Sequence, residues 1–276
     1  MTSKVLRVLA VVVVITVLLV AERATPGTDL GTVVTDFTAG LSANQEYQQP
    51  NPGELAATAA GFSAALDHRK AAEFTDLGFT VRDGVDSATG RAYTIAVSER
   101  AWGMYVIDRS AALSVAVEVP HPVSDLHTEL VGVDLFRHEP GAVLLVAGAH
   151  RRAADVAHEP ASVFHTVATV LARRGLAQVQ LHGFDDRNLP ATDVVLSSGA
   201  ALAGDLARQT ADRLTAGGFA VCHAWTERCD GLEGRTNVQG ELAAAAGTEF
   251  LHVEMSRTVR DSPGRRADLV RALIHA

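Results

Sequence analysis

The chain has 276 residues, of which 47% are hydrophobic and 20% are charged, and its formal net charge is −8. This apolar content can build the core of one large domain or two small ones, and it excludes a chain that is disordered throughout. The acidic balance disfavours a nucleic-acid partner. Two cysteines are too few for a disulfide framework or a cysteine-rich zinc module. An enzyme or a ligand-binding domain remains.

The N-terminal segment predicts the compartment. Lys4 and Arg7 precede an apolar run over residues 8–21, which is shorter than the roughly 20 residues of a full membrane span. Residues 1–21 therefore predict a signal peptide or signal anchor, with the rest of the chain secreted or held by one anchor at the outer face of the cytoplasmic membrane. Residues 22–52 lack periodicity and predict a flexible linker. Residues 53–276 then form a single α/β hydrolase-type domain.

The two cysteines fit the same compartment. Cys222 and Cys229 enclose the six residues HAWTER, and outside the cytoplasm such a pair can close a small loop as a disulfide. Two reduced, buried cysteines are the alternative.

From residue 53 onward, helical and strand patterns alternate. A helix is expected over 53–74, followed by short strands over 79–82 and 93–99. Five apolar, β-branched runs then predict buried strands over 113–119, 142–148, 177–181, 193–197 and 249–254. Helices are expected between and after them, over 125–136, 161–175, 201–218, 237–247 and 262–276. This alternation predicts a three-layer α/β/α sandwich with a mostly parallel or mixed central sheet.

Chemistry-bearing side chains follow four of the predicted strands. His121, His150 and His182 each come at or just after the end of a strand, and Glu254 ends the strand EFLHVE. The carboxyl ends of strands in an open α/β sheet meet at one edge, where ligands bind. We therefore expect these side chains to gather there.

The segment VPHPVSDLHTE combines ligand types that a metal ion requires. Asp125 lies four residues after His121 and Glu129 lies eight after it, so an imidazole and a carboxylate can approach one point. The alternative is that Asp125 or Ser124 caps the following helix and Glu129 is solvated.

Two further clusters supply acid–base and anion-binding groups. In FLHVEMSR, His252 and Glu254 face the same way along a strand, and Glu254 is a candidate general base. Arg151 and Arg257 are candidate carboxylate clamps, since the planar guanidinium suits that group. A buried ion pair between Glu254 and Arg257 is the alternative. The sequence has no GxSxG, GxxxxGK[ST] or GxGxxG motif.

The motifs VPHPVSDLHTE, QLHGF and HVEMSR resemble those of the zinc-dependent N-formylglutamate amidohydrolases and the phage-type poly-γ-glutamate hydrolases, and more distantly the zinc carboxypeptidases. The resemblance implies an α/β/α fold, one Zn²⁺ held by two histidines and a carboxylate, and a catalytic glutamate late in the chain. It assigns the metal to His121 and His182. The carboxypeptidase glutamate falls three residues after the first histidine, where this chain has Ser124, so the third ligand is Asp125 or Glu129, with Asp125 preferred.

Together these patterns predict an exported zinc-dependent hydrolase of amide bonds. Its catalytic residues are Glu254 with Arg151 or Arg257, and its metal ligands are His121, Asp125 and His182, with Glu129 and His150 in reserve. The expected partner is a small carboxylate-bearing peptide or N-acyl amino acid, such as a γ-glutamyl, formyl-amino-acid or cell-wall peptide. The alternative is a non-catalytic cell-envelope domain of the same fold that binds a metal or an anion. A purely structural anchored domain without metal is a third reading.

Overall fold

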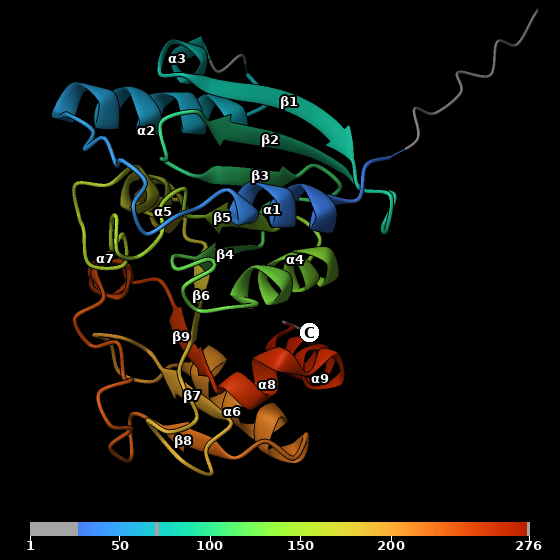
Figure 1. Ribbon diagram of the computed structural model, residues 1–276, viewed down its shortest axis with the longest axis vertical. Coiled ribbons are helices and arrows are strands. Elements are labelled where there is room, and N and C mark those ends of the chain that lie inside the picture. Colours follow the sequence, from blue (N-terminus) through green and yellow to red (C-terminus); the bar gives the residue numbers. More distant parts are fainter. Residues whose placement is uncertain (1–26, 70–71, 275–276) are drawn as a thin grey trace, which may run out of the picture.

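The computed structural model describes residues 27–69 and 72–274. Its centre is a nine-stranded mixed sheet with strand order β1-β2-β3-β5-β4-β6-β9-β7-β8 (Figure 1). The strands are β1 (Phe79–Val85), β2 (Ala92–Ser98), β3 (Met104–Asp108), β4 (Val115–Val119), β5 (Val143–Val146), β6 (Ala177–Gly183), β7 (Val194–Ser197), β8 (Val221–His223) and β9 (Phe250–Met255). The predicted α/β class with a mixed central sheet is confirmed.

Four strands at the centre of the sheet run parallel. β4 pairs with β5 and β6, and β6 pairs with β9, all in parallel register. On one side β3 pairs antiparallel with β5, β2 with β3 and β1 with β2, and on the other β7 pairs antiparallel with β9. The parallel strands therefore deliver their carboxyl ends to one edge of the sheet, as expected.

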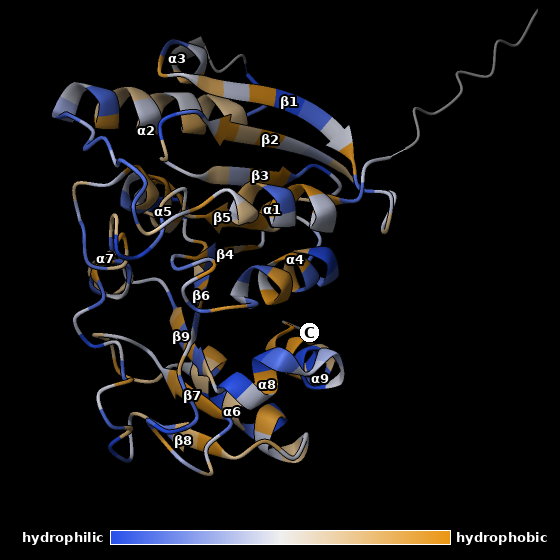
Figure 2. Cartoon of the chain, viewed as in Figure 1, coloured by the Kyte–Doolittle hydropathy of each residue, from blue (hydrophilic) through white to orange (hydrophobic). Residues whose placement is uncertain are grey.

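Helices cover both faces of the sheet (Figure 1). One face packs against α1 (Leu30–Ala39), α4 (Thr128–His138), α6 (Asp205–Ala216), α8 (Arg257–Asp261) and α9 (Pro263–Leu273). The other packs against α2 (Pro52–Leu66), α3 (Ala72–Asp76), α5 (Val163–Arg173) and α7 (Val238–Ala246). Edge strand β1 is exposed along most of its length and carries hydrophilic residues (Figure 2). Apolar burial on the two faces thus produces two separate cores.

The prediction of a flexible linker over residues 22–52 is wrong for its described part. Residues 30–39 form α1, whose Leu30 and Val34 are fully buried against the sheet and α4. The following segment is tied down by side-chain amides, because Gln45 donates to Gly148 O at 2.9 Å and Gln49 donates to Ala161 O at 2.8 Å. Polar composition concealed these contacts, since the glutamines bind backbone rather than solvent.

Other element boundaries also differ from the expectation. The helix predicted over 53–74 is two helices, because α2 ends at Leu66 and His68 takes a left-handed conformation with φ of 56°. The strands β3 and β8 and the helices α1 and α8 were not predicted. The predicted signal segment, residues 1–21, lies outside the described residues. Among the helices of residues 27–69 and 72–274, none has the length and apolar character that a membrane span needs.

One face of the central sheet carries a buried polar layer. In β6, Val179 and Leu181 enter the core beneath α4, and the alternating Gln178, Gln180 and His182 point to the opposite face. All three polar side chains are nonetheless buried. Gln178 donates to Ala168 O of α5 at 3.1 Å, so helices, not solvent, cover this layer. It leads directly to the edge where the predicted site residues lie.

Candidate metal centre

Three side chains meet at the carboxyl edge of the parallel strands. His121 follows β4, His182 lies near the end of β6, and Asp125 lies in the loop after His121. The Nδ1 atoms of the two histidines are 3.1 Å apart, and Asp125 Oδ2 lies 3.3 Å from His121 Nδ1 and 3.4 Å from His182 Nδ1. All three residues are buried. The structure therefore brings the preferred metal ligands of the sequence prediction to one point.

The spacing of these atoms fits a tetrahedral metal ion. Ligands at 2.0–2.1 Å from zinc, separated by the tetrahedral angle, lie roughly 3.3 Å from one another. The three observed separations, from 3.1 to 3.4 Å, match this value. Three protein ligands leave a fourth position open, which is the arrangement of catalytic rather than structural zinc sites.

A strained turn explains why Asp125 and not Glu129 completes the group. Asp125 N donates to His121 O at 3.0 Å, and Val123 has a φ of 68°, which is unusual for a β-branched residue. This turn folds the Asp125 carboxylate back onto the histidine. α4 begins later, after His127 as its N-cap. The described residues contain a second potential metal-binding group, His182, His252 and Glu254, which shares His182 with the first. Glu129 is buried on α4 and belongs to neither group.

Hydrogen bonds to the remote ring nitrogens orient both imidazoles. His121 Nε2 lies 2.8 Å from Asp155 Oδ1, and His182 Nε2 lies 2.7 Å from Gln180 Oε1. Because an oxygen acceptor holds each Nε2, each Nδ1 is left to face the centre. Such outer contacts commonly orient histidine ligands of metals.

The charges of the group support a cation. Burial disfavours the charged form of Asp125, but hydrogen bonds with His121 and His182 outweigh it and keep the pKa of the carboxyl below its usual range. Burial lowers the pKa of His182 to about 4, so this ring is neutral at pH 7 and has a free lone pair. Asp125 and His182 are thus in the protonation state that metal binding requires. Burial lowers the pKa of His121, but hydrogen bonds with Asp125 and Asp155 outweigh it and raise that pKa, so this ring releases a proton when it binds a metal.

Glu254 lies beside this group. It pairs in register with His182 across β6 and β9 and lines the same cavity of about 300 Å³. Its Oε2 atom is buried with no hydrogen-bond partner among the described residues. Burial raises the pKa of this carboxyl to about 8. A buried carboxyl with a raised pKa beside a group of potential metal ligands is a candidate acid–base group.

The two arginines occupy different places. Arg151 lines the cavity, and its Nε lies 3.2 Å from Asp155 Oδ2. Arg257 is not among the described residues that line the cavity. Its guanidinium pairs with Asp261 one helical turn away, at 2.6 Å. The reserve ligand His150 lies beside Ser124 Oγ, 3.3 Å away, and belongs to neither potential metal-binding group. The structure thus places Arg151 at the site and directs Arg257 elsewhere.

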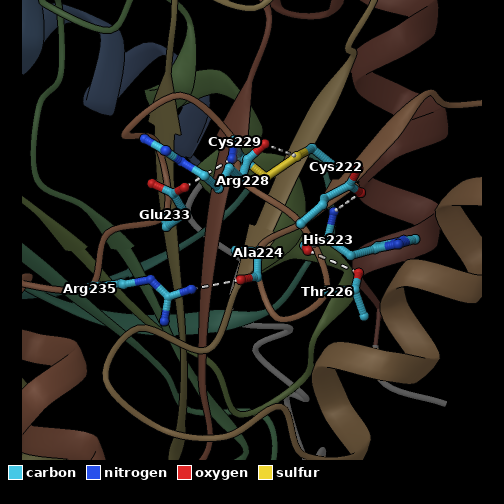
Figure 3. Close-up of a disulfide and its surroundings, with 9 residues drawn as sticks. Cys222, His223, Ala224, Thr226, Arg228, Cys229, Glu233 and Arg235 are labelled. Atoms are coloured by element: carbon cyan, nitrogen blue, oxygen red, sulfur yellow. Dashed lines mark hydrogen bonds between the residues drawn. A yellow bond between two sulfur atoms is a disulfide. The ribbon is translucent and has the colours of Figure 1, made fainter.

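A loop that closes the cavity was not predicted as part of the site. Residues 231–237 line it, and the predicted disulfide between Cys222 and Cys229 is present just before this loop (Figure 3). Glu233 Oε1 accepts from Cys229 N at 2.9 Å, and Arg235 donates to Ala224 O at 2.8 Å. The disulfide-closed loop and the segment that follows it therefore support each other as one wall of the cavity.

Gln180 also escaped sequence analysis, although its signal was present. The alternation in AQVQLH places it on the same strand face as His182, but a glutamine in such a pattern usually faces solvent.

A second, larger hollow of about 590 Å³ lies between the segment after α1 and the loop after β2. None of the three grouped ligands lines it.

No family model matches the chain, and no curated protein matches it. Solved structures similar to it include a gene product of Agrobacterium tumefaciens, with 14% identity, a TM-score of 0.45 and coverage of 61% of this chain and 91% of that one. A bacteriophage poly-γ-glutamate hydrolase has 16% identity, a TM-score of 0.43 and coverage of 61% and 84%. An aspartoacylase family protein of Mesorhizobium loti has 14% identity, a TM-score of 0.39 and coverage of 70% and 67%. Likenesses of this extent assign neither a family nor an activity.

Proposed function

We propose that this protein is an exported zinc-dependent hydrolase of amide bonds. The observation that carries the proposal is the triangle of His121 Nδ1, His182 Nδ1 and Asp125 Oδ2, with sides of 3.1, 3.3 and 3.4 Å. Two imidazole nitrogens and one carboxylate oxygen at this spacing suit zinc and leave one position open. Glu254, whose Oε2 has no hydrogen-bond partner within residues 27–69 and 72–274, lines the same cavity.

The metal ion, Glu254 and Arg151 have separate roles in the proposed reaction. When bound, zinc supplies a Lewis acid that polarises the scissile carbonyl and lowers the pKa of an attacking water. Glu254 takes the proton from that water and passes it to the leaving amide nitrogen. Burial raises the pKa of Glu254 to about 8, and a carboxyl with a raised pKa is suited to hold the proton that it passes to the leaving nitrogen. Arg151, at the cavity rim, binds a substrate carboxylate.

The substrate is a small carboxylate-bearing peptide or N-acyl amino acid. A cavity of about 300 Å³ is at the lower end of ligand pockets, which favours a few residues over a long chain. The Cys222–Cys229 disulfide is typical of proteins outside reducing compartments. With the apolar N-terminal run, it supports export, and a small cell-envelope peptide is the substrate that this address favours.

The metal content of the purified full chain tests the centre. We expect about one zinc per chain in the native protein and loss of zinc in His121→Ala and in His182→Ala. His138→Ala is the matched control, because His138 is exposed on α4, where its Nδ1 lies 2.8 Å from Asp134 O. A native protein that takes up no zinc after reconstitution contradicts the proposal.

The Glu254→Gln variant separates an enzyme from a binding domain. We expect it to keep its zinc and to lose about 10²- to 10⁴-fold in kcat on formylated amino acids, γ-glutamyl dipeptides or short peptides with a free carboxylate. A native protein that holds zinc and turns over none of these substrates would be a non-catalytic metal-binding domain instead.

A further inference from the structure

Gln180 is a buried amide with every hydrogen-bonding position occupied. Its Oε1 lies 2.7 Å from His182 Nε2 and also accepts from Asn237 Nδ2. Its Nε2 donates to Glu118 Oε2 at 2.8 Å and to Gln239 Oε1 at 3.1 Å. Gln180, Gln239 and Glu118 are fully buried, and Asn237 is 1% exposed. A buried side chain that makes four hydrogen bonds has one orientation.

The backbone of α7 determines which way this amide points. Asn237 is the N-cap of that helix, and its Oδ1 accepts from Gln239 N at 3.0 Å and from Gly240 N at 3.2 Å. Backbone N–H groups can only donate, so the Asn237 oxygen must face them. Its Nδ2 group must then face Gln180, and the atom of Gln180 that meets it must be the carbonyl oxygen.

The same oxygen contacts His182, so the chain of constraints reaches the metal centre. An amide oxygen can only accept, and His182 Nε2 must therefore carry the proton. A neutral imidazole has one N–H and one lone pair, and the lone pair of His182 is thus on Nδ1. That atom faces His121 and Asp125.

We propose that Gln180 is a positioning residue that makes Nδ1 the metal-binding nitrogen of His182, and that the Asn237 cap of α7 sets its orientation. The effect on metal binding rests on the proposed function, whereas the hydrogen bonds that orient Gln180 and His182 do not depend on it. The two imidazoles are then held differently, His121 by the carboxylate of Asp155 and His182 by a neutral amide. Asn237 also lines the cavity, so the cavity wall and a metal ligand share one hydrogen-bond network.

The first test reads the tautomer of His182 in the metal-free full chain by long-range ¹H–¹⁵N NMR, with the signal assigned by its loss in His182→Asn. We expect the proton on Nε2 in the native protein. In Asn237→Asp the helix cap is kept, but an oxygen replaces the amide donor. The Gln180 amide then rotates so that its NH₂ group faces position 237 and His182 Nε2. The proton of His182 therefore moves to Nδ1. A native proton on Nδ1, or no change in Asn237→Asp, would overturn the proposal.

The second test measures the zinc Kd by competition with a chelator. We expect Gln180→Met to weaken zinc binding by about 10- to 100-fold, as loss of an outer partner of a histidine ligand typically does. Gln178→Met is the matched control, because Gln178 lies on the same strand face and is equally buried but contacts Ala168 O. We expect its Kd to match the native value. Equal weakening in both variants would show a general packing effect and would refute the positioning role.

The two tests separate this inference from the proposed function. A native protein that binds no zinc ends the proposed function, whereas the tautomer of His182 in the metal-free protein still decides the role of Gln180. If Gln180→Met does not fold, the exchange variant that combines Gln180→Glu with Glu118→Gln replaces it. That pair keeps an oxygen toward His182 and an amide donor toward position 180, so we expect near-native zinc affinity. Zinc affinity as weak as that of His182→Ala would contradict the role.

Discussion

Glu118 offers a direct test of the buried polar layer. Its carboxyl is fully buried in the central strand β4, where Oε2 accepts from Gln180 at 2.8 Å. Its Oε1 has no hydrogen-bond partner among the described residues. Burial raises the pKa of this group from 4.5 to about 8. The folded chain therefore holds a proton on Glu118 at neutral pH that the unfolded chain releases.

The sign of the pH dependence follows from this difference. Between about pH 4.5 and pH 8 the folded state binds one more proton at this site than the unfolded state does. The free energy of unfolding consequently falls as pH rises through that window, by roughly 1 kcal/mol per pH unit and a few kcal/mol in total. Below pH 4.5 both states are protonated, and the contribution is fully present.

The variant Glu118→Gln removes the titration and keeps the oxygen that Gln180 contacts. Urea unfolding of chelator-treated native and variant proteins at pH 5, 6, 7 and 8 gives the difference in unfolding free energy. The unfolding free energy of the native protein minus that of the variant should fall by a few kcal/mol from pH 5 to pH 8. Gln178→Met is the control, because neither glutamine nor methionine titrates. The difference between its unfolding free energy and that of the native protein should therefore be the same at every pH. A constant difference for Glu118→Gln would refute the reasoning.

Two stability predictions concern the wall of the cavity. Gly234 and Gly231 have positive φ values of 57° and 84°, but only at Gly234 would a new Cβ meet a neighbour, 2.6 Å from His252 Nε2. Denaturant unfolding should therefore show Gly234→Ala to be less stable than Gly231→Ala by about 1–3 kcal/mol, whereas equal losses would mean that the His252 contact is unimportant. Replacing both Cys222 and Cys229 by serine should lower the unfolding free energy by roughly 2–3 kcal/mol through the unfolded state. Unchanged stability under non-reducing conditions would contradict that prediction.

The sequence by itself determined the class of fold and the edge at which the chemistry gathers. Runs of β-branched residues bounded by turns identify β4, β5, β6, β7 and β9, because buried strands need such side chains at every position or every second one. The placement of His121, His182 and Glu254 at strand ends then follows from parallel geometry alone. These inferences succeeded because they depend on local periodicity, which the chain displays directly.

Only the tertiary structure decided which atoms form the site. The choice of Asp125 over Glu129 depends on a turn with a left-handed Val123, and no propensity predicts that conformation for valine. The separation of Arg151 from Arg257 depends on the ion pair with Asp261. In each case the same local sequence pattern is compatible with several sets of contacts, and the tertiary structure selects one of them.

The buried polar layer shows the physical reason most clearly. Gln180 and Glu118 would face water in an ordinary amphipathic strand, and α1 lies in a segment whose composition resembles a linker. Whether a polar side chain is solvated or buried depends on the partner that distant segments supply, here Asn237 and Gln239 of α7. Periodicity tells which residues share a face of a strand, and packing alone tells what covers that face.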